Sequence, residues 1–255
     1  MEWREEAVVL SVRRHGESSA IAMALTESRG KAAGLVRHAQ SKAMRGILMP
    51  GNRVAVSWRA RLEDHLGTFS VEPVSSHTAA LLMDPGRLAA LGAACALVDV
   101  GLPEREPHPD LFHSLDALVI ALDSPEWAET YVRWEVGLLA ELGFGLDLSK
   151  CAVTGEVENL TYVSPKTGRA VTAETAAPYR DKLLTLPRFL TERGRSSLPK
   201  RDGDRDGENP DPEAIARGLR LTGYFLERHI FSMLDKPLPD ARLRLYERFR
   251  KAAAA

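Results

Sequence analysis

The sequence predicts an α+β protein of more than one domain, in which a small β-barrel is followed by a mainly helical region. Residues 1–77 hold short segments of alternating apolar character with turn residues between them. From residue 79 onward the apolar residues recur at helical spacing. The charge also changes along the chain, since residues 1–78 carry 11 Lys and Arg against 8 Asp and Glu, and residues 79–150 carry 4 against 12. We therefore expect one domain over 1–78 and a second over 79–255.

Five short strands are expected in the first domain. They cover residues 7–14, 19–26, 31–37, 53–62 and 66–71. The longest gap, 39–49, lies between the third and fourth strands, which is where an OB-fold places its helix or loop. The pattern therefore favours a five-stranded OB-fold barrel, a fold that binds single-stranded nucleic acid through a cationic groove and aromatic platforms.

The stretch from 34 to 62 is rich in cations and holds no acid before Glu63. In its last part a period of two places Arg53, Arg59 and Arg61 on one face and Trp58 on the other, among valines. Rows of guanidinium groups suit bidentate recognition of phosphate. A solvated strand surface would show the same charges, so this alternative stays open. Trp58 could serve as a stacking platform, but its phase favours the core.

The second domain is expected to be a helical bundle. Asp84-Pro85 is a typical helix start, and the apolar stripe that follows carries Leu88, Leu91, Cys95 and Val98. A later helix of the bundle begins at Ser124-Pro125 and carries one cation, Arg133, among glutamates. That arginine is either half of a surface ion pair or an anchor for an acidic partner peptide.

Residues 143–193 read as an irregular region, with a small hairpin expected over 162–172 and an apolar segment over 183–190 that docks on the bundle. Residues 194–211 have no apolar period and read as a loop, in which the spacing of the acids does not suit calcium. Another helix follows Asp211-Pro212, with a stripe reaching Met233. A basic tail helix over 242–251 carries Leu243, Tyr246 and Phe249 on one side. One helical domain is thus expected to close across the irregular region.

Several function classes are disfavoured. Phosphate-binding, dinucleotide-binding, hydrolase and metalloprotease motifs are all missing, so we expect a protein that is not an enzyme. Two cysteines, Cys95 and Cys151, do not make a disulfide framework. The N-terminus lacks the pattern of a signal peptide and no apolar run is long enough to span a membrane, which favours the cytoplasm.

Segments along most of the chain resemble the bacterial RecO family of DNA repair proteins. In the first half these are GKAAGLVRHAQSK at 30–42, RGILMPGNRV at 45–54 and LGTFSVEPV at 66–74. In the second half they are LLAELGFGLDLSKCAVTG at 138–155 and YVSPKTGRAV at 162–171.

The resemblance implies a mediator of recombination at the nucleoid. Such proteins bind single- and double-stranded DNA, anneal strands and help load RecA, together with RecR, onto DNA coated by single-strand binding protein. It implies that the barrel contacts phosphates through Arg13, Arg14, Lys31, Arg37, Lys42, Arg45, Arg53, Arg59 and Arg61. It also implies that Arg133 anchors the acidic tail of single-strand binding protein.

The resemblance also bears on metal binding and on an alternative function. Many members of the family hold zinc with four cysteines, of which only Cys151 is matched here, so no zinc or other cofactor is expected. The alternative is an adaptor whose helical domain binds proteins and whose barrel has little affinity for DNA.

Overall fold

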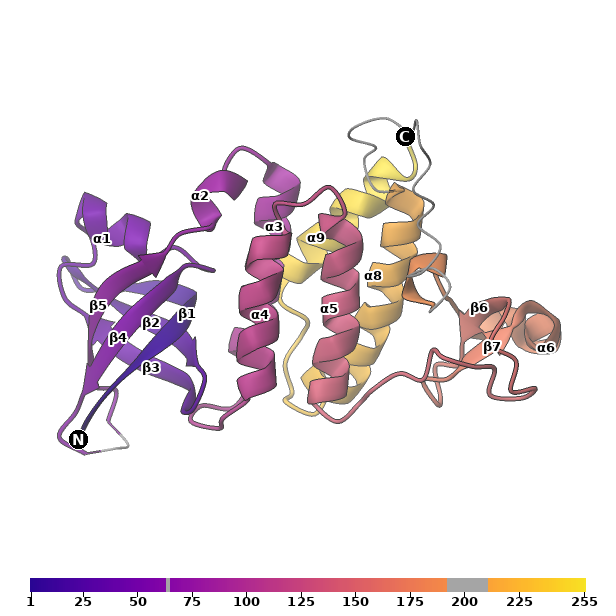
Figure 1. Ribbon diagram of the computed structural model, residues 1–255, viewed down its shortest axis with the longest axis horizontal. Coiled ribbons are helices and arrows are strands. Elements are labelled where there is room, and N and C mark those ends of the chain that lie inside the picture. The colour runs from indigo at the N-terminus through magenta and orange to yellow at the C-terminus, as the bar shows by residue number, and fades with distance from the viewer. Residues whose placement is uncertain (63–64, 192–210) are drawn as a thin grey trace. The chain divides into compact units, whose positions relative to one another are not determined.

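The computed structural model describes residues 1–62, 65–191 and 211–255. Strands occupy the first part of the chain and helices most of the rest, which confirms the α+β prediction (Figure 1). The contacts divide the chain into two compact units. The first contains residues 1–123 and 239–242, and the second contains residues 124–238 and 243–255. Among the described residues, no helix is both long enough and apolar enough to cross a membrane.

The first unit is built on a closed barrel with the strand order β1-β2-β3-β5-β4. The strands are β1 (Glu2–His15), β2 (Ser19–Thr26), β3 (Gly30–Val36), β4 (Arg53–Arg59) and β5 (Thr68–Ser75). Only the β3–β5 pair is parallel among the pairings of this barrel. Helix α1 (Lys42–Ile47) lies between β3 and β4, as an OB-fold requires, so the predicted fold is confirmed.

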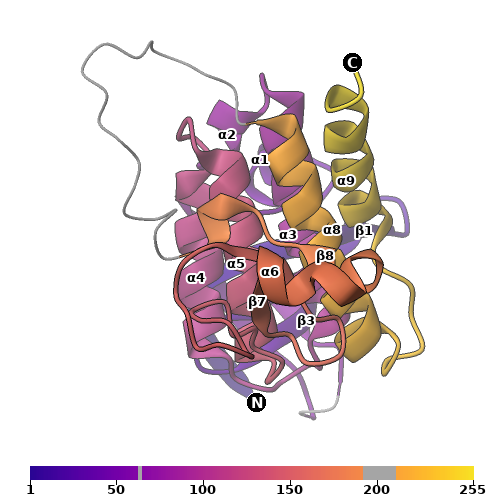
Figure 2. The same cartoon turned by 90° about the vertical axis from the view of Figure 1, so that its right-hand side faces the viewer.

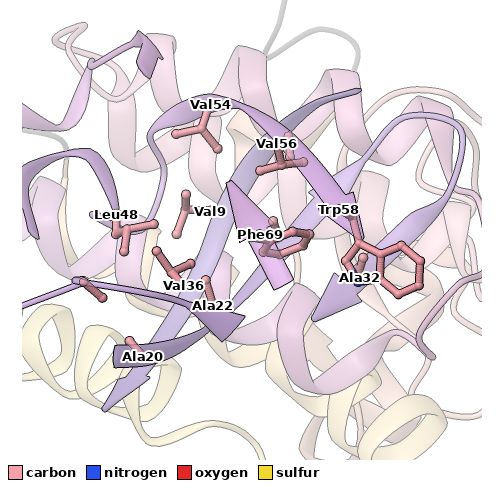
Figure 3. Close-up of a cluster of buried hydrophobic side chains, with 13 residues drawn as sticks. Val9, Ala20, Ala22, Ala32, Val36, Leu48, Val54, Val56, Trp58 and Phe69 are labelled. Carbon is pink, nitrogen blue, oxygen red and sulfur yellow. The ribbon is translucent and has the colours of Figure 1, made fainter. Parts of the chain in front are cut away.

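The interior of the barrel is filled by alternate residues of each strand (Figure 3). On β4 the side chains of Val54, Val56 and Trp58 are 1%, 1% and 4% exposed, so the predicted phase and the core position of Trp58 are confirmed. The strand ends at Arg59, however, and Leu62 is 56% exposed. The strand predicted over 53–62 was therefore too long, and alternation fixes the direction of a side chain only while the strand continues.

Helices α3 (Pro85–Gly101) and α4 (Pro109–Ala121) cover outward-facing apolar residues of the barrel, and the short helix α2 (Thr78–Leu81) precedes them. As predicted, Asp84 caps α3, since its Oδ1 accepts hydrogen bonds from the backbone N–H groups of Gly86 and Arg87 at 2.7 and 3.1 Å. Helix α3 packs on β1 and α4 contacts β2, so both belong to the same compact unit as the barrel.

The second unit is centred on α5 (Trp127–Glu141) and α8 (Pro212–Leu226), which pack side by side (Figures 1 and 2). The hydroxyl of Thr222 on α8 donates a 2.5 Å hydrogen bond to Glu135 on α5, and both residues are fully buried. Asp211 caps α8 by accepting from the N–H of Glu213 at 3.0 Å. The expected packing of helices from before and after the irregular region is therefore confirmed.

The irregular region folds as a three-stranded sheet in the order β7-β6-β8. Short helical turns accompany it, of which α6 is labelled in Figure 2. The expected hairpin is present. The segments are β6 (Leu160–Val163), β7 (Ala170–Thr172), α6 (Ala173–Ala176), η1 (Ala177–Lys182), β8 (Leu184–Thr185) and η2 (Arg188–Leu190). The loop predicted over 194–211 lies outside the described residues, apart from Asp211.

Two predicted stripe residues near the C-terminus are exposed. Met233 is 74% exposed because α8 continues into a π-helical turn, η3 (Glu227–Phe231). The i→i+5 hydrogen bonds of this turn put extra residues into it and shift the residues after it out of the 3.6-residue period. Helix α9 (Asp240–Ala252) buries Leu245 and Phe249, whereas Leu243 is 42% exposed.

Candidate nucleic-acid interface

Five of the nine predicted phosphate contacts are exposed, and their side chains have no hydrogen-bond or ion-pair partner in the part of the chain that is described. They are Arg13, Arg37, Lys42, Arg45 and Arg61. Arg14 is also exposed, and its Nε donates to the carbonyl of Gly16 at 3.1 Å. These six cations can turn toward an anionic ligand without first giving up an acidic partner.

Most of these cations gather at one end of the barrel. The register pairs Arg14 with Ala20 and Ala20 with Val36, which brings the end of β1 beside the end of β3, where Arg37 follows. The backbone N–H of Gln40 also donates to the carbonyl of Ser18 at 3.3 Å, tying the connection after β3 to the β1–β2 turn.

Helix α1 adds two further cations to this end. Ser41 caps the helix by accepting from the N–H of Met44 at 3.3 Å. The cap fixes the start of a helix that presents Lys42 and Arg45 to solvent. Arg61 lies apart from this group, in the connection between β4 and β5.

The two arginines of β4 are neutralised by acids. Arg53 contacts Glu6 at 2.7 Å and Asp116 at 2.5 Å, and its guanidinium lies 5.5 Å from the Phe112 ring centroid. Partial burial lowers the pKa of Arg53, but the ion pairs with Glu6 and Asp116 outweigh it and leave the pKa above its ordinary value. Arg59 makes bonds of 2.8 and 2.9 Å to the two carboxylate oxygens of Glu2. The guanidinium groups of Arg53 and Arg59 therefore form a ladder of ion pairs between β4 and β1, and we call these two pairs the ion-pair ladder.

Lys31 is buried, at 6% exposure, and this removes it from the surface that we assign to DNA. Its ammonium group donates to the backbone carbonyl of Asp99 and lies 3.9 Å from the carboxylate of the same residue. Lys31 was among the predicted phosphate contacts, which require a side chain that faces solvent. The tertiary structure instead covers β3 at this point, because α3 and the connection after it lie over the strand.

A pocket of about 670 Å³ opens beside β2, β3 and the β4–β5 connection. Part of its wall is apolar, formed by Ile21, Met23 and Ala33. Trp3 and Trp58 contribute aromatic surface, with stacked rings whose centroids are 5.7 Å apart. Oligonucleotides bind OB-folds on this β2–β3 side, between the β1–β2 and β4–β5 connections.

Arginines line the same pocket. Arg13 belongs to β1, Arg29 follows β2, and Arg105 comes from the connection between α3 and α4. The Arg29 guanidinium lies 5.5 Å from the centroid of the Trp3 ring and 3.2 Å from a carboxylate oxygen of Glu5. The pocket thus combines apolar and aromatic surface with guanidinium groups.

The connection that carries Arg105 is fixed tightly against the barrel. The N–H of Arg105 donates to the carbonyl of Lys31 at 2.8 Å, and its guanidinium donates to the carbonyl of His65 at 3.4 Å. Arg105 has a φ of 64°, a left-handed conformation that is uncommon for residues other than glycine. Gly30 permits the close approach, since a Cβ there would lie 1.9 Å from the carbonyl oxygen of Glu106.

Sequence reasoning missed three residues of this pocket. Trp3 stands in phase with Ala7 and Val9 on the inward face of β1, so extending that alternation toward the N-terminus would have found it. Arg29 lies in a turn and Arg105 in a connection far along the chain. The predicted strands on either side of Arg29 place it in the barrel, but nothing local indicates a pocket there. Arg105 carries no local signal that it contacts the barrel.

Arg133 has the acidic neighbour that one sequence interpretation expected. Its guanidinium contacts Glu129 at 2.8 Å, one helical turn away, and lies 5.4 Å from the Phe189 ring centroid. It also lines a pocket of about 280 Å³, together with Val136 and Leu190. The side chain is 27% exposed, so it remains accessible at the edge of this hollow, which Asp147 and Ser149 also line.

Cys151 is buried, at 2% exposure, and its thiol lies 3.7 Å from the hydroxyl of Thr175. Burial raises the pKa of this thiol, but hydrogen bonds from the hydroxyl and N–H of Thr154 and from nearby backbone N–H groups outweigh burial and lower the pKa to about 6. By contrast, burial raises the pKa of Cys95 to about 12. No group of three or more potential metal-ligating side chains is present within 1–62, 65–191 and 211–255.

The fold places this chain among proteins that join an OB barrel to a helical part. Residues 1–77 match the family model Recombination protein O N terminal, and residues 82–236 match Recombination protein O C terminal. The DNA repair protein RecO of Rhodospirillum centenum is 52% identical over 254 residues, which cover 99% of this chain and 96% of that protein. Those of Caulobacter vibrioides (strain NA1000) and Cereibacter sphaeroides (strain ATCC 17029) are 49% and 48% identical over 253 residues, 99% of this chain and 99% and 100% of theirs.

The chain belongs to the RecO family of DNA repair and recombination proteins. Family membership supports a role in DNA repair and recombination, with DNA and other repair proteins as partners.

Proposed function

We propose that this protein is a non-enzymatic recombination mediator that acts in the cytoplasm at the nucleoid. It binds single- and double-stranded DNA and anneals complementary strands. Together with RecR, it helps load RecA onto DNA coated by single-strand binding protein. The observation that carries the proposal is the set of exposed cations at one end of the OB barrel, which have no acidic partner among the described residues. Phosphates would replace water around these groups without breaking an ion pair.

The decisive experiment is annealing of complementary strands that have been coated with single-strand binding protein. Adding this protein should accelerate annealing, and high salt should suppress the effect, because phosphate contacts release counterions. Equal annealing rates with and without the protein, at salt concentrations that permit DNA binding, would refute the annealing role. A RecA-dependent strand-exchange assay with and without RecR tests the loading step separately.

We further propose that Arg133 anchors the acidic tail of single-strand binding protein. The support is its position at the edge of a hollow that Val136, Leu146, Leu148 and Leu190 line together with Asp147 and Ser149, so that a cation and apolar surface are offered side by side to an acidic peptide. The pairing with Glu129 opposes this role, since the tail would have to compete with that acid. Arg133→Glu should abolish binding of a tail peptide in a fluorescence anisotropy titration. Glu129→Gln should strengthen it.

An adaptor with little DNA affinity is the second candidate function. The observation that favours it is the ion-pair ladder, which neutralises Arg53 and Arg59. Filter binding with the full chain across a range of salt concentrations separates the two functions. The isolated barrel is a poor probe, because removing α3 would expose Val8 and Leu10 on β1, which are 0% and 2% exposed in the full chain.

We also propose that the protein needs no zinc. The support is chemical, since a structural zinc site is closed by four ligands and Cys151 is the only cysteine in the irregular region. Metal analysis of the purified protein tests this proposal, and stoichiometric zinc would contradict it.

A further inference from the structure

The pocket beside β2 and β3 combines apolar surface with positive charge. Apolar and aromatic surface comes from Met23, Trp3 and Trp58, and guanidinium groups come from Arg13, Arg29 and Arg105. Two acids, Glu2 and Glu104, also line it, but the three arginines outnumber them and Glu2 is paired with Arg59. A ligand complementary to the pocket therefore needs a flat apolar part together with negative charge. We propose that this pocket binds the unpaired base of one nucleotide of single-stranded DNA, with its arginines on the flanking phosphates. The inference rests on the proposed DNA-binding function and specifies one contact within it.

The size and position of the pocket support a nucleotide. A volume of about 670 Å³ lies within the usual range for small-molecule sites, roughly 300–1,000 Å³. The pocket lies on the β2–β3 side of the barrel, beside the β4–β5 connection that supplies Leu66. Arg13 belongs both to the group of exposed cations and to the lining of the pocket, so the pocket adjoins the surface that we assign to phosphates.

The aromatic surface is held in place before any ligand arrives. Trp3 stacks on Trp58, and Trp58 is fixed in turn because its Nε1 donates to the carbonyls of Ala33 and Leu66 at 3.2 and 3.1 Å. Phe69 meets the Trp3 ring edge to face, with centroids 6.1 Å apart. A half-buried tryptophan with two aromatic neighbours loses little freedom when a base packs on it.

Arg29 extends this platform. Its guanidinium lies over the Trp3 ring, and its side chain is 48% exposed. Bases stack on guanidinium planes as well as on aromatic rings. The Arg29–Trp3 pair therefore offers stacking surface together with positive charge.

The conformation of Arg105 gives the pocket a rigid third side. The left-handed φ and the close approach of residues 104–107 to the β2–β3 turn hold this connection against the barrel. Backbone strain of this kind persists only where the surroundings fix it. The connection therefore forms a fixed wall, against which a base can be held.

A base in a duplex cannot enter the pocket, because its edge is paired and its faces are stacked on neighbours. The inference therefore predicts that the pocket contributes to binding of single strands and not of duplexes. It also predicts that removing bases while keeping the phosphates weakens binding.

The test compares a thymidine oligonucleotide of about 12 residues, within the span of one OB-fold, with an abasic strand of the same length. Both strands carry the same phosphates, so a difference in affinity for the full-length protein at equal salt reports contacts with bases. We expect the abasic strand to bind about tenfold more weakly, as expected for loss of one stacked base. Equal, measurable affinities would overturn the inference and leave the proposed DNA binding intact. Failure of both strands to bind would overturn the proposed function as well.

Variants locate the contact. Trp3→Ala should reduce the ratio between the two affinities to near one, whereas Trp3→Phe, which keeps an aromatic ring, should retain most of it. Circular dichroism checks that the variants fold. If Trp3→Ala does not fold, Ala33→Leu serves instead, because the larger side chain occupies part of the pocket, and it should reduce the ratio in the same way. An unchanged ratio in a folded variant that blocks the pocket would overturn the inference.

An acidic peptide with an aromatic residue is the competing occupant. If such a peptide binds wild-type protein but not Ala33→Leu, while the abasic and thymidine strands bind alike, the pocket is a protein-binding site and the inference is wrong.

Discussion

Neutralising three exposed cations near α1 should weaken DNA binding by an amount that can be calculated. The variant Arg37→Gln, Lys42→Gln, Arg45→Gln removes three positive charges that have no acidic partner among the described residues. Each phosphate contact on a single strand contributes about 0.7 to the slope of log K against log salt, so the slope should fall by about 2. At 0.1 M salt this corresponds to about 100-fold weaker binding, or about 2.8 kcal/mol, and the curves should converge near 1 M.

The assay is a fluorescence anisotropy titration of a labelled single strand at several salt concentrations. The matched control is Arg4→Gln, Arg217→Gln, Arg250→Gln, which lowers the net charge equally. It removes arginines that are paired with the exposed acids Glu72, Glu213 and Glu247. Exposed pairs contribute about 0–1 kcal/mol to folding, so both proteins should remain folded. If the control loses as much affinity as the test variant, binding follows net charge and the assignment of these three cations is refuted.

The remaining predictions concern stability and one excluded contact. Gly34→Val should destabilise the barrel by about 1–3 kcal/mol in urea titrations, because a Cβ at Gly34 would lie 2.4 Å from the Phe69 ring; unchanged stability would contradict the tight packing. Lys31→Met should leave DNA affinity unchanged while costing about 1–3 kcal/mol of stability, since the carbonyl and carboxylate of Asp99 lose their cation. The folded-state pKa of Cys151, about 6, lies below the ordinary value of 9.0, so the thiolate stabilises the fold above pH 9.0, and this contribution is lost as the pH falls toward 6. Cys151→Ala should therefore lose more stability relative to wild type at pH 9.0 than at pH 6, and equal losses would argue against the lowered pKa.

The local patterns predicted the elements well where one residue type decides the local structure. Asp84 and Asp211 each precede a proline, and each caps the helix that the pattern places there. Alternation on β4 placed Val54, Val56 and Trp58 inside the barrel. These predictions succeed because caps and strand faces depend on neighbours within a few residues.

The site could be predicted only in part, for two physical reasons. The cationic stretch was visible in the sequence, but the acids that neutralise Arg53 and Arg59 are Glu2 and Glu6 of β1 and Asp116 of α4, all distant along the chain. Burial of Lys31 likewise depends on Asp99, which is 68 residues away. Whether a charge is free for a ligand is decided by such long-range neighbours, and composition does not contain that information.

The sequence by itself determined the barrel, the helical part and the cations from which a DNA-binding surface is drawn. Strand alternation, turn residues and helix caps act over short distances along the chain, so they can be read there directly. Only the tertiary structure decided which cations remain without a partner and where a pocket forms. Trp3, Arg29 and Arg105 come from separate segments, and the closure of the barrel and the packing of the α3–α4 connection bring them together.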